Sequence, residues 1–197
     1  EIRMNRKPAP AVPSVQQLEE ELKREKYRDR YKRLLRGTVS TVLVVIAAVV
    51  LLSNLLLPVL RIYGSSMTPT LANGNIVAAL RYGSYDRGDI VAFYYNNQIL
   101  VKRIIALPGE TVDIDEEGNV SIDGELLDEP YLVEKAFGEC DIELPYQVPE
   151  GRYFVMGDNR GVSSDSRSSQ VGCVAEEQVV GKLIFRLWPL DALGTIE

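Results

Sequence analysis

The chain has 197 residues, which is enough for one domain of ordinary size with additional segments. It contains no histidine, and this excludes a Ser-His-Asp triad, a Cys-His dyad and every histidine-based metal site. The net charge of −6 is unevenly distributed, because residues 1–60 hold 11 Lys and Arg against 6 Asp and Glu, whereas residues 61–197 hold 11 against 22. An acidic body repels phosphate, so this balance argues against a nucleic-acid partner and favours a membrane protein with a basic end.

The first 36 residues are expected to form a basic cytoplasmic tail. Residues 7–13, Lys-Pro-Ala-Pro-Ala-Val-Pro, predict a stiff, unfolded leader. Ser14 and Gln17 form a capping-box pattern, and residues 15–33 predict a charged helix. Both a solvated helix and a coiled coil fit this segment, and the solvated helix is preferred.

An uncharged stretch of 24 residues follows, from Gly37 to Leu60. As a helix it would reach roughly 36 Å, enough to cross a hydrocarbon core of about 30 Å. A buried core helix and a cleavable signal peptide are the alternatives. A signal peptide has an apolar core of only about 7–15 residues close to its N-terminus, so a retained single-pass anchor in a lipid bilayer is favoured.

The orientation of this anchor is predicted by the Lys and Arg residues that precede it. Eight of them lie between Lys23 and Arg36. By the positive-inside rule the N-terminus is cytoplasmic, and residues 61–197 lie outside the cell membrane.

Residues 61–197 predict an all-β domain of barrel or sandwich type, so the chain is mostly β behind an N-terminal transmembrane helix. Asn96-Asn97 and Asp123-Gly124 are typical of tight hairpin turns, as is Glu117-Gly118-Asn119. The more acidic residues 111–151 are expected to form a smaller inserted β lobe. The predicted strands are rich in Val, Ile, Tyr and Phe and cover residues 75–81, 89–95, 98–105, 111–115, 119–123, 152–156 and 179–187.

The two cysteines, Cys140 and Cys173, cannot form a zinc site on their own. A single disulfide in a domain outside the cell and two unpaired buried thiols both fit the sequence. We expect neither a metal nor another cofactor.

Three stretches combine residue types that carry chemistry. Residues 64–71, Gly-Ser-Ser-Met-Thr-Pro-Thr-Leu, would on their own be a Ser/Thr-rich turn. Lys102 lies inside an apolar strand, where a lysine is rare unless it is paired or functional; the alternative is that it points to solvent. Residues 156–167 hold several Asp, Arg and Ser side chains, which alone would be a surface salt-bridge cluster.

Together these stretches resemble the bacterial type I signal peptidases. Residues 66–71 are similar to the nucleophile box of that family, and residues 101–103 with 107–110 are similar to its general-base box. Residues 157–160 with 163–167 are similar to its most characteristic box, and Gly181-Lys182 and Trp188-Pro189 match its ending. The resemblance covers about residues 35–190, and the single span looks like the short Gram-positive-type branch.

The resemblance implies a Ser-Lys dyad. Ser66 would attack the scissile carbonyl, and Lys102 would take the serine proton and pass it to the leaving amine. Lys102 must then be neutral, although a free lysine has a pKa of about 10.4; apolar neighbours lower that value. Ser163 matches the hydroxyl that orients the lysine. Ion pairs that fix the loop are expected between Asp165 and Arg167 and between Asp158 and either Arg160 or Arg103.

The sequence departs from the broader family near these residues. Gly64 stands where some members carry a serine that helps to hold the oxyanion. Oxyanion stabilisation is therefore expected from the backbone N–H of Ser66 and from one further donor that remains open. Gly161-Val162 and residues 168–172 also differ from the usual pattern, which bears on the rigidity of this loop.

The position of Ser66 also indicates a substrate. It lies six residues beyond the uncharged stretch, so at most about 20–22 Å separate it from the predicted membrane boundary. The expected partners are the signal peptides of exported preproteins, with small residues at −3 and −1, bound as an added strand beside residues 62–66 and 98–102. The expected pocket residues are Ile62, Gly64, Met67, Leu71, Leu100 and Val101.

Two other functions fit parts of the sequence. One is a Ser-Lys protease that cuts itself or a regulatory partner, against which the retained anchor and residues 157–160 argue. The other is a non-catalytic membrane-bound binding factor, against which the presence of both Ser66 and Lys102 argues.

Overall fold

The structure is a computed structural model in which residues 14–81 and 83–196 are described. The chain divides into two compact units, residues 1–51 and residues 52–197. The predicted leader at residues 7–13 lies outside the described residues.

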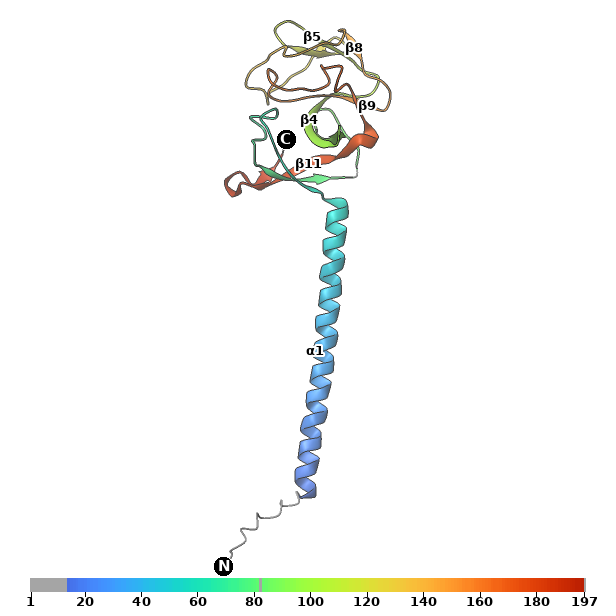
Figure 1. The fold of residues 1–197 in the computed structure, drawn as a ribbon, viewed down its shortest axis with the longest axis vertical. Helices are drawn as coiled ribbons and strands as arrows, with labels where there is room; N and C mark the ends of the chain where they lie inside the picture. Colours follow the sequence, from blue (N-terminus) through green and yellow to red (C-terminus); the bar gives the residue numbers. More distant parts are fainter. Residues whose placement is uncertain (1–13, 82, 197) are drawn as a thin grey trace, which may run out of the picture. The chain divides into compact units, whose positions relative to one another are not determined.

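Helix α1 runs without a break from Val15 to Leu56 (Figure 1). It begins with the predicted capping box: the N–H of Gln17 donates to Ser14 Oγ at 3.4 Å, and the N–H of Ser14 donates to Gln17 Oε1 at 3.0 Å. The predicted charged helix and the predicted span are thus one element. The helix ends two residues before Pro58, which cannot continue the hydrogen-bond pattern, so residues 57–60 of the predicted span are not helical.

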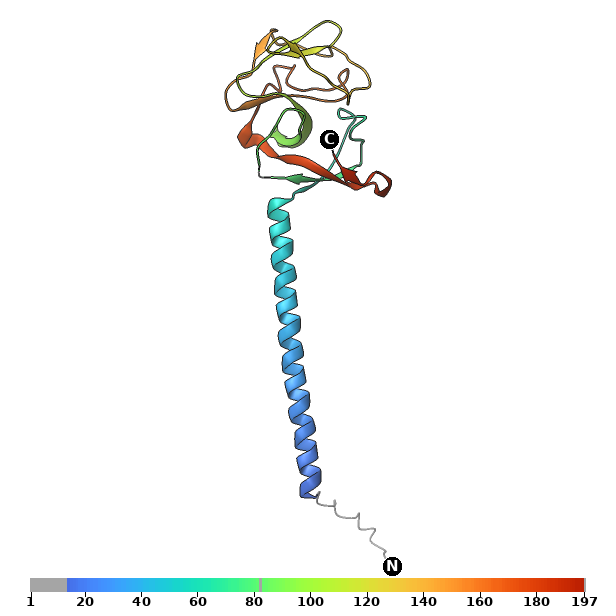
Figure 2. The same cartoon turned by 180° about the vertical axis from the view of Figure 1, so that it is seen from behind.

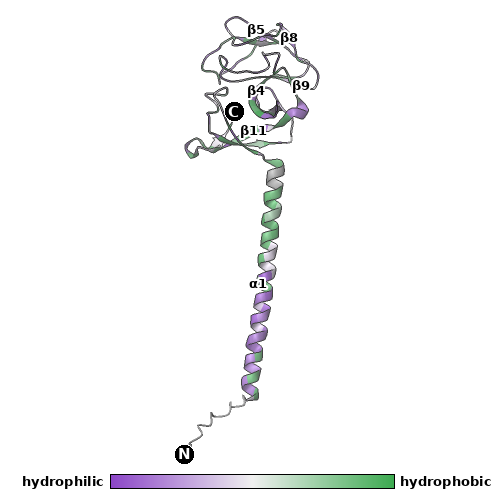
Figure 3. Ribbon diagram, in the orientation of Figure 1, coloured by the Kyte–Doolittle hydropathy of each residue, from purple (hydrophilic) through white to green (hydrophobic). Residues whose placement is uncertain are grey.

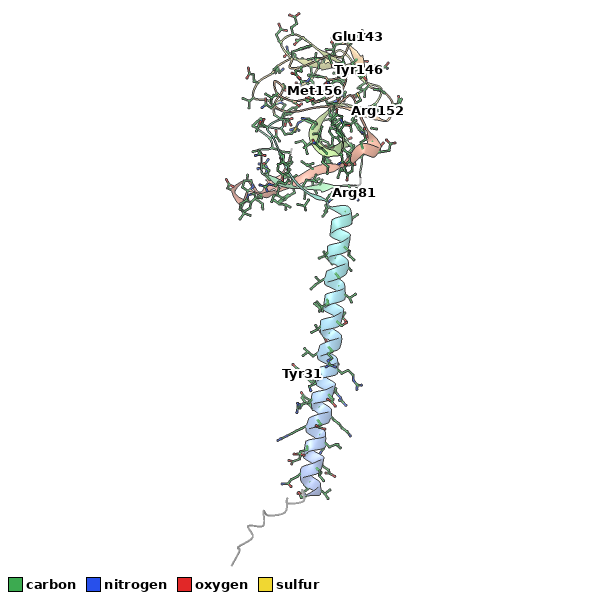
Figure 4. The ribbon with its side chains drawn as sticks, in the orientation of Figure 1. Tyr31, Arg81, Glu143, Tyr146, Arg152 and Met156 are labelled. Carbon is green, nitrogen blue, oxygen red and sulfur yellow. The ribbon has the colours of Figure 1, made fainter. Side chains whose placement is uncertain are left out.

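Hydropathy changes along α1, with hydrophilic residues in its first half and hydrophobic residues in its second half (Figure 3). The stretch Val15–Leu51 is long and apolar enough to cross a membrane by length and composition. Its side chains are exposed throughout and project outward around the helix, as Tyr31 does in Figure 4. A helix surface that is apolar all round and not covered by protein is typical of a membrane span.

The described part of residues 52–197 forms two antiparallel sheets. The main sheet has the order β1-β2-β11-β3-β4-β9-β10, with β12 paired to β11. Its strands are β1 (Val59–Arg61), β2 (Ile76–Leu80), β3 (Ile90–Tyr95), β4 (Gln98–Ala106), β9 (Arg152–Met156), β10 (Val174–Ala175), β11 (Val179–Trp188) and β12 (Gly194–Thr195). The second sheet has the order β7-β6-β5-β8, with β5 (Thr111–Ile114), β6 (Val120–Ile122), β7 (Glu125–Leu126) and β8 (Tyr146–Gln147). Two short 3-10 helices, Glu176–Gln178 and Leu190–Ala192, flank β11.

All seven predicted strands are present, as β2, β3, β4, β5, β6, β9 and β11, and their ends lie within one residue of the predicted bounds. The all-β prediction for the region after the helix is therefore confirmed. The short strands β1, β7, β8, β10 and β12 were not predicted, because two or three residues are too few to show an alternating pattern.

The hairpin between β3 and β4 sets the position of Lys102. Its turn residues, Asn96 and Asn97, have φ values of 44° and 62°, which is the left-handed backbone that a two-residue type I′ turn requires. This turn pairs Val91 with Lys102 and Ile90 with Arg103 across the two strands. The predicted turn at Asn96-Asn97 is thus confirmed, and it fixes the register of the strand that carries the lysine.

The second sheet lies within residues 111–151, here called the lobe, which the chain forms between β4 and β9. In both Figure 1 and Figure 2, β4 and β9 lie between β11 and the lobe, which is coloured yellow to orange. Figure 4 labels Tyr146 in the lobe and Met156 close to it. A shared apolar core joins the lobe to the main sheet; it contains Ile105, Phe154 and Met156 from the main sheet with Val112, Val120 and Val148 from the lobe.

The net negative charge of residues 61–197 lies in the lobe. The lobe contains 13 Asp and Glu and one basic residue, Lys135, whereas the remainder of residues 61–197 contains 10 Lys and Arg and 9 Asp and Glu. Cys140 and Cys173 both carry free thiols, and Cys173 is buried in the core beneath the lobe.

Candidate active site

The loop between β1 and β2 carries Ser66, which is half-buried. Apolar side chains fix the loop on both sides, because Ile62, Met67 and Leu71 are buried in one core with residues of β2, β3 and β11. Leu71 is fully buried. These three side chains place Ser66 at the surface of a packed core.

Gly64 explains one departure from the family pattern. Its φ of +87° lies in the left-handed region, where a serine would be strained, and its N–H donates to Asn73 Oδ1 at 3.2 Å. The glycine is therefore required by the backbone of this loop.

Lys102 lies in β4 and is buried, with 3% of its surface exposed. Its Nζ donates to Ser163 Oγ at 2.9 Å. Burial, which disfavours the ammonium, lowers the pKa of Lys102 to about 8, while Asp165 and Asp158 raise this pKa and Arg167 lowers it. The alternative of a solvent-facing lysine is thus wrong.

Ser66 and Lys102 line the same cavity, which has a volume of about 480 Å³. Its other lining residues are Leu60, Arg61, Ile62, Tyr63, Gly64, Met67, Gln98, Ile99, Leu100 and Val101. These include every predicted pocket residue except Leu71, which points into the core beneath the loop. Among the described residues, no hydrogen bond joins Ser66 Oγ to Lys102 Nζ.

Gly157 is packed between Ser163 of its own stretch and the loop that carries Ser66. A Cβ at this position would lie 2.3 Å from Ser163 Oγ and 2.5 Å from the backbone oxygen of Ser66, so neither contact leaves room for a side chain. The next residue but one, Asn159, donates its backbone N–H to the same Ser66 oxygen at 3.0 Å. The spacing between the Ser66 loop and Ser163 therefore depends on a residue without a Cβ.

Two buried ion pairs support this arrangement. Arg167 binds Asp165 through two hydrogen bonds of 2.9 Å each, and Asp165 also accepts the N–H of Gly157 at 3.0 Å. Burial acts to raise the pKa of Asp165, but the hydrogen bonds and charge of Arg167 hold it below its ordinary value. Arg103 binds Asp158 through hydrogen bonds of 2.9 Å and 2.8 Å, so Arg103 rather than Arg160 is the partner of Asp158.

Arg160 instead pairs with Glu129 of the lobe, and both side chains are fully buried. Tyr131 contributes a second lobe side chain: the Cζ atom of Arg103 lies 3.9 Å from the centre of its ring. Neither lobe residue is predicted from the sequence. Glu129 is one of 13 acidic residues in the lobe, and no local pattern distinguishes it from the others.

The family described as "Signal peptidase, peptidase S26" matches residues 35–188. The chain belongs to this family. Signal peptidases of the family are serine peptidases that remove signal peptides, and the resemblance found in the sequence is confirmed.

Two curated relatives are similar over most of their length. Signal peptidase IB of Staphylococcus aureus (strain Mu50) is 36% identical over 150 residues, which are 66% of this chain and 77% of that protein. Signal peptidase I S of Bacillus subtilis (strain 168) is 35% identical over 174 residues, 82% of this chain and 93% of that protein. A crystal structure of a signal peptidase I from Enterococcus faecalis V583 is 36% identical and covers 51% of this chain and 97% of that chain, with a TM-score of 0.45.

Proposed function

We propose that the chain is a membrane-anchored serine endopeptidase that removes N-terminal signal peptides from exported preproteins with a Ser66–Lys102 dyad. The observation that carries this proposal is that Ser66 and a buried lysine of lowered pKa line one mostly apolar cavity. Family membership supports the reaction class, and the absence of histidine leaves Lys102 as the base that the cavity offers.

In the first step, neutral Lys102 removes the proton of Ser66 Oγ while this oxygen attacks the scissile carbonyl. The backbone N–H of Ser66 donates to the oxyanion that forms. The two side chains approach each other when substrate fills the cavity, since catalytic hydrogen bonds are often long in free enzymes. Ser163 accepts one hydrogen bond from Lys102 Nζ and so limits the directions in which the amine points.

In the second step, the Lys102 ammonium gives its proton to the nitrogen of the mature protein, and the C–N bond breaks. The signal peptide is then held as an ester on Ser66. A water molecule gives a proton to Lys102 and attacks the ester, which releases the signal peptide as a carboxylic acid and returns the proton to Ser66 Oγ.

The cavity supports the assigned substrate class. Ile62, Met67, Leu100 and Val101 present apolar atoms around Ser66, which suits the small apolar residues at −3 and −1 of a signal peptide. Residues 98–102 belong to β4 and residues 62–66 follow β1, so both offer backbone groups to an extended peptide. Five of the six predicted pocket residues line the cavity, and Leu71 does not.

The function is tested with the purified full-length chain in lipid vesicles and a purified preprotein. Wild-type protein is expected to release a mature protein with one defined new N-terminus, whereas Ser66→Ala releases none. Ser164→Ala is the matched control, because Ser164 is an exposed serine of the same site region and its loss is expected to leave turnover unchanged. A serine-reactive fluorescent probe that labels Ser66→Ala as strongly as wild type contradicts the assignment of the nucleophile.

The topology is part of the same proposal. We propose that α1 crosses the cell membrane once, with residues 1–36 in the cytoplasm and the β domain outside, on the basis of the polybasic cluster before Gly37. A protease added to intact cells should then digest residues 61–197, if anything, and spare residues 1–36, and permeabilised cells should lose both. Loss of the tail with protection of the β domain would reverse the orientation.

A further inference from the structure

Two side chains of the lobe, Glu129 and Tyr131, each contact one of the arginines that lie next to the proposed catalytic groups. Glu129 binds Arg160 of the loop after β9, and the ring of Tyr131 faces Arg103 of β4. Neither lobe residue lines the cavity, so any effect on the reaction passes through the arginines. We call Glu129 and Tyr131 the lobe brace.

The first contact of the lobe brace is that of Tyr131 with Arg103, in the strand β4 that also carries Lys102. Arg103 follows Lys102 directly, and the edges of its guanidinium are used by Asp158 and by the backbone oxygen of Gly88 at 2.8 Å. The Tyr131 ring covers the face of the guanidinium, with its centre 3.9 Å from Arg103 Cζ. Edge and face contacts together restrain Arg103, and with it the backbone of β4 next to Lys102.

The second contact reaches the loop that carries Ser163. Glu129 holds the Arg160 guanidinium, whose Nε donates to the backbone oxygen of Gly157 at 3.1 Å. Gly157 is packed between Ser163 Oγ and the backbone oxygen of Ser66. A displacement of Arg160 is therefore passed to the residue that sets the spacing between the serine loop and Ser163.

The two contacts are linked to each other. Tyr131 Oη donates to Glu129 Oε1 at 2.8 Å. Burial and the neighbouring Glu129 carboxylate raise the pKa of Tyr131, which keeps the phenol protonated as a donor. The strand of Lys102 and the loop of Ser163 are therefore restrained by one connected pair of side chains from a different sheet.

We propose that Glu129 and Tyr131 are positioning residues, which hold Lys102 Nζ and Ser163 Oγ in the geometry that the Ser66–Lys102 reaction needs. This inference rests on the proposed function. A misplacement of about 1 Å between reacting groups lowers a rate about 100-fold, so a brace of this kind acts on kcat while KM stays unchanged.

The experiment compares Tyr131→Leu with Tyr131→Phe in the full-length chain, with kcat, KM and the unfolding midpoint measured for each. Tyr131→Leu removes the ring from Arg103 and is expected to lower kcat about 10-fold or more, with KM within about twofold of wild type. Tyr131→Phe keeps the ring and loses only the hydroxyl, so its kcat is expected to stay within about threefold of wild type.

Tyr146→Leu is the matched control. Tyr146 is another half-buried tyrosine of the lobe, but it packs against Phe154 in the core beneath the lobe, with the two ring centres 6.0 Å apart. The Tyr146→Leu variant is expected to lower the unfolding midpoint about as much as Tyr131→Leu does, while its kcat remains that of wild type. If Tyr131→Leu lowers only the unfolding midpoint, or if both leucine variants lose kcat equally, the brace is structural and the proposal is wrong.

A second variant keeps the test decisive if Tyr131→Leu does not fold. Glu129→Asp retains the charge opposite Arg160 and shortens the side chain by one methylene; a lowered kcat with unchanged KM supports the proposal, and a wild-type kcat overturns it. Ser66→Ala is measured in parallel. Cleavage by Ser66→Ala would refute the proposed function itself, whereas an inactive Ser66→Ala beside a fully active Tyr131→Leu refutes only the brace.

Discussion

Outside the lobe, residues 61–197 contain 10 basic and 9 acidic residues. Six of these 19 ionisable side chains are buried. In the lobe, 13 acidic residues stand against one lysine, and most of the acidic side chains are exposed. Among the described residues, Glu129 is the single lobe residue whose charged side chain is buried, and its partner belongs to the main sheet. The two regions therefore use charge in different ways.

The difference indicates what each kind of charge does. Burying a charged pair carries a large desolvation cost that attraction only partly offsets, so such pairs add little net stability. Here they restrain strand β4, which carries Lys102, and the loop after β9, which carries Ser163. The exposed acidic side chains of the lobe accept at most hydrogen bonds from nearby polar groups, as Asp115 does from Asn119. Their expected contribution is to solubility.

The largest effect is expected at the lysine of the main sheet. Lys102→Arg keeps the positive charge but cannot deprotonate, so cleavage of a preprotein should fall about 10²–10⁴-fold. The control is Lys182→Arg on β11, where the lysine is partly exposed and pairs with Asp89; its turnover should be unchanged. Near-normal turnover by Lys102→Arg would show that Lys102 is not the base.

The buried and exposed ion pairs should differ in stability. Arg167→Ala leaves the Asp165 carboxylate buried without its partner, and we expect the free energy of unfolding to fall by about 3–5 kcal/mol. Arg87→Ala removes one partner of an exposed pair with Glu110, where a loss of about 0–1 kcal/mol is expected. Denaturant unfolding of the two variants measures the contrast, and equal losses would remove the distinction between the two kinds of pair.

The pH dependence of cleavage should follow the lysine. In the proposed mechanism Lys102 acts in its neutral form, and burial lowers its pKa to about 8, so kcat/KM should fall about tenfold per pH unit below that value. The groups that face the ammonium are Asp165, Asp158, Arg167 and the Ser163 hydroxyl. The profile should persist when Cys140 and Cys173 are changed to Ser, and full activity at about pH 5 would contradict it.

The same pKa predicts a stability effect of defined sign. Unfolded Lys102 stays protonated up to its ordinary pKa of 10.5, so between about pH 8 and 10.5 the unfolded chain binds more protons than the folded chain. The free energy of unfolding should therefore rise with pH across this window. Subtracting the profile of Lys102→Met isolates this contribution, and the absence of any difference would mean that the pKa is not lowered.

The smallest effect is expected from the exposed charges of the lobe. Replacing Asp113, Glu116 and Glu125 together by Asn or Gln should change kcat/KM by less than about twofold and the free energy of unfolding by less than about 0.5 kcal/mol per position. A loss of activity comparable to that of the Lys102 variant would mean that exposed lobe charges take part in the reaction.

The sequence predicts the long strands well and the contacts between elements poorly. Strands of five residues or more with alternating or continuous apolar residues carry a clear local signal, which is why the bounds of β2, β3, β4 and β11 are predicted within one residue. The partner of Asp158 depends instead on the register of β4 against β9, in which Arg103 lies opposite Met156. Without that register, the sequence cannot show whether Arg103 or Arg160 is the ion-pair partner of Asp158.

The candidate site shows the same limit. Ser66, Lys102 and Ser163 are proposed from the sequence because each lies in a recognisable stretch, and the structure brings the lysine and Ser163 into contact. Leu71 was expected in the pocket, but the turn in which its N–H donates to the backbone oxygen of Met67 directs it into the core. Glu129 lies 31 residues from its partner Arg160, in a segment where acidic residues are common, so only the fold identifies it.

The two-residue turn at Asn96-Asn97 has a consequence for how the protein tolerates insertions and deletions. Neighbouring residues of a strand point to opposite faces, so Lys102 reaches the cavity while Arg103 reaches the buried carboxylate. Deleting one asparagine would shift β4 by one position against β3 and exchange the two cations. The composition of the strand would be intact, yet a permanently protonated guanidinium would face Ser66. The chemistry of this chain is therefore sensitive to the length of an exposed turn that contacts none of the proposed catalytic groups.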